Sequence, residues 1–105
     1  MKKIIIDKNQ DLVDLRNLCL TELLDLSDVE LEGSYYCDNN YLTSLRGAPL
    51  TVSRSFSCMY NNLTSLEGIP KTVGVHFFID KSLKDKFPNK YIRSLCKIGG
   101  AIFYR

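Results

Sequence analysis

A segment of thirteen residues occurs twice in this chain, first at positions 37–49 and again at positions 58–70. The first copy reads Cys-Asp-Asn-Asn-Tyr-Leu-Thr-Ser-Leu-Arg-Gly-Ala-Pro, and the second reads Cys-Met-Tyr-Asn-Asn-Leu-Thr-Ser-Leu-Glu-Gly-Ile-Pro. Eight of the thirteen positions are identical, and Tyr35, Phe56 and Phe77 form a further column at the same interval. A fixed period of this length is typical of stacked structural units, each of which buries its apolar side against the next.

Within one unit, the sequence predicts a short strand, a tight turn and a return segment. Phe56 and Cys58 are two positions apart, so on a strand both point into the core while Ser57 points outward. Asn61 falls where the chain turns, and its amide can bond to backbone groups that would otherwise lack partners. We therefore expect structural roles for both repeated pairs. Asn40 and Asn61 should be buried amides that bond to the turns, and Cys37 and Cys58 should be free thiols in the core.

The repeated Asn-x-Leu-Thr-Ser-Leu segment, followed by a proline, resembles the leucine-rich repeat family, in the short form with repeats of about 21 residues found in bacteria and bacteriophages. The resemblance implies an α/β solenoid-like fold, a minimal leucine-rich repeat stack of short parallel strands. It further implies that outward strand residues form the recognition surface.

The segments on either side of the repeats are expected to cap a single domain. Residues 1–30 would be the N-terminal cap, 31–80 about three repeats, and 81–105 the C-terminal cap. Leucines spaced three and four apart over residues 11–26 favour a capping helix. The alternative is a degenerate repeat, but counting back one repeat period from Tyr35 and Cys37 reaches Asp14 and Arg16, which opposes it.

In the C-terminal cap, a short helix is expected between Ser82 and Pro88, and a second one from Asn89 to the pair Gly99-Gly100. Tyr91, Ile92, Leu95, Cys96 and Ile98 would form the apolar side of that second helix. Residues 101–104 then read as a final strand that covers the edge of the last repeat.

Charge divides unevenly along the chain, although the net charge is only +2. Residues 11–38 contain eight acidic residues and one arginine, a net of −7, whereas residues 81–105 contain seven basic residues and one aspartate, a net of +6. Such a chain could bind an acidic partner or nucleic acid through its basic end, or stack head to tail with other copies.

The sequence contains no recognisable catalytic motif, and it predicts a protein that is not an enzyme. It has one histidine and no Cys-x-x-Cys pair, so we expect no metal site and no cofactor. The apolar run at the start is too short for a signal peptide, and no run is long enough for a membrane span. These features favour a cytoplasmic protein that does not interact with membranes.

The resemblance therefore implies a protein-binding module. More specifically, it suggests a phage-encoded factor that binds and inhibits a host protein. The alternatives are a nucleic-acid or acidic-partner binder that uses Lys81 to Arg105, and a self-assembling structural protein in which copies of the chain form a homo-oligomer. The predicted partner-binding residues are Tyr36, Asp38, Arg54, Ser57, Met59, Tyr60, His76, Phe78 and Asp80.

Overall fold

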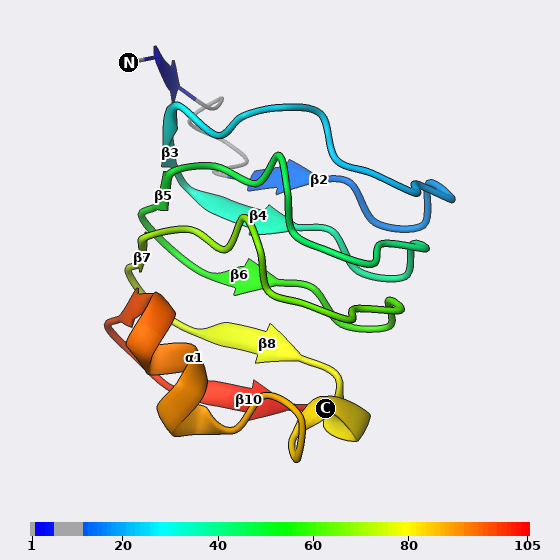
Figure 1. Cartoon of the computed structure of the whole chain (residues 1–105). Coiled ribbons are helices and arrows are strands. Elements are labelled where there is room, and N and C mark those ends of the chain that lie inside the picture. Colours follow the sequence, from blue (N-terminus) through cyan, green and yellow to red (C-terminus); the bar gives the residue numbers. More distant parts are fainter. Residues whose placement is uncertain (1, 6–11) are drawn as a thin grey trace.

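The chain winds into a solenoid with two parallel sheets (Figure 1). The structure is a computed structural model that describes residues 2–5 and 12–105. The first sheet has the order β1-β3-β5-β7-β9, and the second has the order β10-β8-β6-β4-β2. The strands of the first sheet are β1 (Lys2–Ile5), β3 (Val29–Glu32), β5 (Thr51–Val52), β7 (Thr72–Val73) and β9 (Lys97–Ile98). Those of the second are β2 (Leu12–Asp14), β4 (Ser34–Tyr36), β6 (Phe56–Ser57), β8 (Phe77–Ile79) and β10 (Ile102–Tyr104).

The predicted repeat is the winding unit of the solenoid. Tyr35 pairs with Phe56, and Phe56 pairs with Phe77, at the same level of neighbouring strands. Their rings stack inside the core, with centroid separations of 5.5 Å and 5.4 Å. The predicted inward column is confirmed, because all three residues are fully buried.

The repeated glycine of each return segment is required by its backbone. Gly47 and Gly68 have φ angles of +96° and +91°, which only glycine adopts readily. A Cβ atom at Gly68 would also lie 2.4 Å from the main-chain oxygen of Leu45 in the preceding coil. The close approach of successive coils therefore depends on this position.

The prediction of a helix over residues 11–26 is wrong for the described residues 12–26. Leu12–Asp14 is instead strand β2, which pairs with β4 and starts a further coil. Val13 lies opposite Tyr35, and Tyr35 lies opposite Phe56, so the first coil has one more residue than the next. A count based on the repeat period therefore misses the first strand. The leucines of this coil lie in a return segment, which, like a helix, places apolar residues three positions apart.

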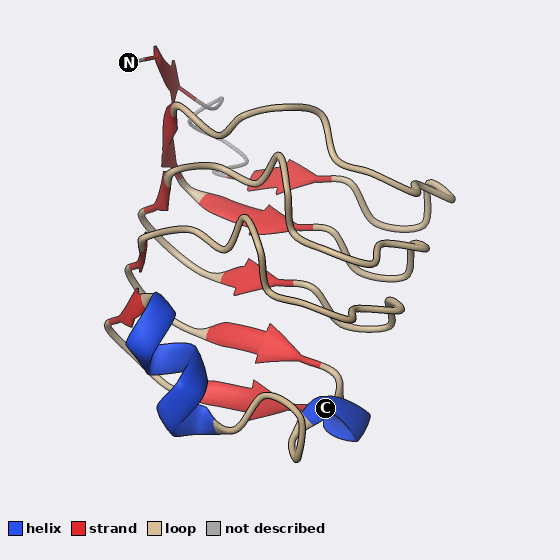
Figure 2. Ribbon diagram, viewed as in Figure 1, coloured by secondary structure: helices blue, strands red, loops and turns tan. Residues whose placement is uncertain are grey.

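The C-terminal segment continues both sheets around a short helical section. A 3-10 helix, η1 (Lys81–Leu83), and a helix, α1 (Asn89–Leu95), replace the return loop of the preceding coils (Figure 2). The predicted final strand is confirmed as β10, which pairs with β8. The second predicted helix ends earlier than expected, because Lys97–Ile98 joins the first sheet as β9.

The apolar side predicted for that helix is only partly correct. Ile92, Cys96 and Ile98 are buried, but Tyr91 and Leu95 are exposed. Among the described residues, no helix is long and apolar enough to cross a membrane.

Candidate functional site

The outer face of the second sheet brings residues from five coils into one row. Asp14 pairs with Tyr36, Tyr36 with Ser57, Ser57 with Phe78, and Phe78 with Phe103. Two positions further along each strand, a second row forms where the strands end. Its members are Arg16, Asp38, Met59, Asp80 and Arg105.

The nine predicted partner-binding residues differ in exposure. Arg54 and Tyr60 are exposed, whereas Tyr36, Met59, His76 and Phe78 are half-buried. Asp38, Ser57 and Asp80 are buried, so the expectation that they lie open on the outer face is wrong. They do occupy outward strand positions, but hydrogen bonds between neighbouring coils enclose them. A binding role for the nine residues stays a prediction.

The two buried carboxylates hold the turn of the second repeat from opposite sides. Asp38 accepts hydrogen bonds from the Ser57 hydroxyl at 2.5 Å and from the Met59 amide at 2.7 Å. Asp80, from the following coil, accepts from the Tyr60 amide at 2.6 Å and from the Asn61 amide at 3.2 Å. Burial raises the pKa of the Asp38 carboxyl, although the two bonds that Asp38 accepts partly oppose the shift.

A pair of Asp38 variants should separate the roles of its oxygen and of its charge. Asp38→Asn keeps an oxygen that can accept both bonds, so the free energy of unfolding at pH 7 should change by less than about 1 kcal/mol. Asp38→Ala leaves two donors without a partner and should cost about 1–3 kcal/mol. Urea unfolding measures both variants, and equal losses in the two would contradict this account.

The raised pKa adds a pH dependence to the same comparison. A carboxyl whose pKa is higher in the folded than in the unfolded state stabilises the fold most below its unfolded value, and this contribution is lost as the pH rises through the folded value. As the pH falls from 7 to 4, the free energy of unfolding of the wild type should therefore rise relative to that of Asp38→Asn.

An aromatic cluster occupies the C-terminal end of the outer face. Phe78 and Phe103 stack with centroids 5.2 Å apart, and the His76 ring meets both edge-on. The Arg105 guanidinium lies 4.9 Å from the Phe103 centroid and 5.7 Å from the Phe78 centroid. His76 is fixed in place, because its Nδ1 accepts a hydrogen bond from the Ala101 amide at 3.0 Å.

Sequence reasoning missed Phe103 and Arg105 as members of this face. The final strand was predicted, but its register against the repeats was not. Phe77 pairs with Ile102, and the chain between them is longer than one repeat because it includes α1. The alternation of Ile102, Phe103 and Tyr104 is the signal that could have placed Phe103 outward.

At the opposite end, Arg16 covers the Tyr36 ring at 5.3 Å and forms an ion pair with Asp14 at 2.8 Å. The side-chain hydrogen bonds from Arg16 lower the pKa of Asp14 to about 2. This end of the face is therefore internally neutralised. Because residues 11–26 were predicted to form a helix, neither Asp14 nor Arg16 was expected on this face.

The predicted turn bonding of the asparagine column is confirmed, but only Asn40 is buried as expected. The Asn40 Oδ1 accepts from the Leu18 and Leu20 amides, and its Nδ2 donates to the carbonyl oxygens of Leu15 and Cys37. Asn61 is half-buried and bonds similarly, with its Oδ1 accepting from the Leu42 amide at 3.1 Å. Each asparagine thus joins its own turn to the coil before it.

The predicted core cysteines are also buried, and all four cysteines of the chain are free. The Cys37 thiol donates to the Ser57 carbonyl oxygen at 3.4 Å, and the Cys58 thiol to that of Phe78 at 3.5 Å. Burial raises the pKa of both thiols above the ordinary range. Buried thiols that stay protonated are poor nucleophiles and poor metal ligands.

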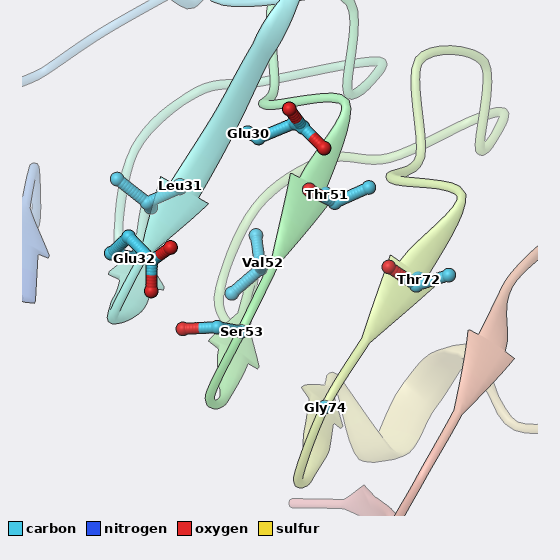
Figure 3. Close-up of a pocket in the computed structure, with 8 residues that line it drawn as sticks. All are labelled: Glu30, Leu31, Glu32, Thr51, Val52, Ser53, Thr72 and Gly74. Atoms are coloured by element: carbon cyan, nitrogen blue, oxygen red, sulfur yellow. The ribbon is translucent and has the colours of Figure 1, made fainter. Parts of the chain in front are cut away.

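A second, polar surface lies on the outer face of the first sheet (Figure 3). A shallow hollow of about 320 Å³ runs beside Glu30, Thr51 and Thr72, with Glu32, Ser53 and Gly74 in the adjacent row. Leu31 and Val52 form its floor and point into the core. Over residues 12–105, no group of three or more histidine, cysteine or acidic side chains is arranged to hold a metal ion.

Comparison with known proteins found no matching family model, no matching curated protein and no matching solved structure.

Proposed function

We propose that the chain is a protein-binding module of the leucine-rich repeat type, which binds its partner with the outer face of the second sheet. The observation that carries the proposal is the cluster of Phe78, Phe103 and His76 beneath the Arg105 guanidinium. A sheet face that only contacts water has no need of three adjacent aromatic rings. A contiguous group of this kind, with arginine, is typical of the centre of a protein interface.

The leucine-rich repeat assignment is supported by the repeated segment and by the asparagine ladder. Asn40 and Asn61 bond to turn backbone at the position where the resemblance requires it. The same resemblance supports the more specific proposal that the chain is a phage-encoded factor that binds and inhibits a host protein.

The size of the sheet argues that the turns beside it also contribute. Five strands at about 4.8 Å spacing, with about three outward positions each, offer only a few hundred Å². A stable interface needs about 800 Å² from each partner. The turn edge next to the sheet, where Tyr60 is exposed, is the adjoining surface that can enlarge it.

Affinity capture with matched baits tests the proposal. The immobilised wild-type protein should retain a partner from a nuclease-treated lysate of the cells that express it, identified by mass spectrometry. Tyr60→Ala should lose that partner by at least tenfold, while Tyr91→Ala, which alters an exposed tyrosine on α1, should keep it. Both variants should melt within a few degrees of the wild type, because neither ring is buried.

Three outcomes would overturn the proposal. The first is a wild-type bait that retains nothing, and the second is equal retention by Tyr60→Ala and Tyr91→Ala. The third is recovery of the chain itself as the sole partner, together with concentration-dependent light scattering, which would favour self-assembly instead.

A further inference from the structure

Tyr60 has a backbone conformation that a bulky side chain rarely adopts. Its φ angle is +57°, in the left-handed region. The corresponding turn positions of the two preceding coils are Asn17 and Asn39, with φ angles of +60° and +56°. Asparagine tolerates this region because its short side chain can bond locally, whereas tyrosine is strained there. The second repeat therefore has tyrosine where the fold favours asparagine.

The surrounding structure imposes this conformation and does not bury the ring. The Asp80 carboxylate binds the Tyr60 amide, and the Asn61 side chain donates to the Met59 carbonyl oxygen at 3.2 Å. The Tyr60 side chain remains 59% exposed, so packing in the core does not compensate for the strain. Strain that the neighbouring structure maintains in this way is characteristic of ligand-binding positions.

Two cations, Lys81 and Arg105, lie at the ends of the two strands that follow this turn in the second sheet. Lys81 directly follows Asp80, is exposed, and donates its amide hydrogen to the main-chain oxygen of Arg105 at 2.9 Å. Neither cation forms an ion pair with any residue in the described ranges 2–5 and 12–105. Asp38 and Asp80, in the same row as Arg105, accept hydrogen bonds from the turn. Arg105 is oriented by the two rings beneath it.

The charge of the rest of the face limits the kind of ligand. Asp14 and Arg16 neutralise each other at the far end. A long polyanion such as nucleic acid, extended along the sheet, would meet no excess of positive charge there. A short segment with one or two carboxylates needs only the C-terminal end of the face.

We propose that Tyr60 is a strained binding anchor which, with Lys81 and Arg105, forms a docking surface for an acidic segment of a partner protein. The Tyr60 ring covers an apolar side chain of that segment, and the two cations bind its carboxylates. This inference rests on the proposed function, since it names the chemistry of the partner at the same face.

The strain is tested by melting temperature. Tyr60→Asn should raise it by about 2–6 °C, because asparagine suits the left-handed backbone. Tyr41→Asn is the matched control, since Tyr41 is 57% exposed but has no positive φ angle, and it should not raise the melting temperature. A fall or no change for Tyr60→Asn would overturn the claim of strain.

The docking surface is tested by NMR titration of the full chain with short synthetic probes. An acetylated peptide of Leu-Phe flanked by pairs of aspartates should shift the amide signals of residues 59–61, 78–81 and 103–105. The same peptide with lysines for aspartates should not. Tyr60→Asn, and Lys81→Gln combined with Arg105→Gln, should each weaken binding of the acidic peptide at least fivefold.

The inference is overturned if the acidic peptide causes no shifts at millimolar concentration, if the variants bind it as well as the wild type, or if oligothymidine binds this surface more tightly. Should the capture experiment still show loss of the partner with Tyr60→Ala, the protein-binding function stands and only the acidic chemistry fails. If capture fails as well, both proposals fall.

Discussion

Phe56→Ala should lower the free energy of unfolding by about 3–5 kcal/mol, the largest loss that we expect from any single truncation in this chain. Phe56 is fully buried between two other rings, 5.5 Å from the Tyr35 centroid and 5.4 Å from the Phe77 centroid. Its removal leaves a cavity and takes a stacking partner from both neighbours. Since small domains are stable by only about 5–15 kcal/mol, urea unfolding should show a variant close to the limit of folding.

Phe103→Ala provides the control for this effect. Phe103 also stacks on a phenylalanine, but it is half-buried on the outer face and has one stacked ring neighbour instead of two. Its loss should be clearly smaller. A Phe56→Ala protein that loses no more stability than Phe103→Ala would show that the aromatic column is not the main support of the core.

Asn40→Ala should cost about 3 kcal/mol, because the Asn40 side chain bonds to several buried or partly buried groups and each buried group left without a partner costs about 1–3 kcal/mol. These groups are two amides and several carbonyl oxygens, which belong to two coils. Asn61→Ala should cost about 1–3 kcal/mol, because Asn61 is less buried and accepts from one amide. Denaturant unfolding of both variants should reproduce this order.

Asn62→Ala is the matched control for the asparagine ladder. Asn62 is adjacent in sequence but exposed, and the hydrogen bond that the structure gives it comes from its backbone amide. It should change the free energy of unfolding by less than about 0.5 kcal/mol. An Asn40→Ala protein as stable as Asn62→Ala would contradict the role assigned to the ladder.

The central coils could be predicted because their period is visible in the sequence. The identity of Asn40 with Asn61, and of Cys37 with Cys58, implied equivalent positions, and the structure places both pairs in equivalent contacts. The first coil could not be predicted in this way, since one additional residue displaces its strand from the count. The leucine spacing of its return segment also matches that of an amphipathic helix, so periodicity alone could not decide between the two.

The outer face could be predicted in outline but not in its details. Strand alternation correctly put Tyr36 and Phe78 on the side opposite the core. Alternation does not reveal which outward residues a neighbouring coil encloses, and Asp38 and Ser57 are enclosed by bonding to each other. The register of β10 depends on how α1 packs, which no count along the chain provides.

The two aspartates that hold the second turn come from different coils, one wound before it and one after. The turn that exposes Tyr60 can therefore reach its final shape only when the chain on both sides is in place. A molecule that is cut short or frayed before Asp80 has the same tyrosine but does not hold it in position. Any recognition through this turn consequently distinguishes molecules in which the coils of both aspartates have formed from molecules in which the later coil is missing.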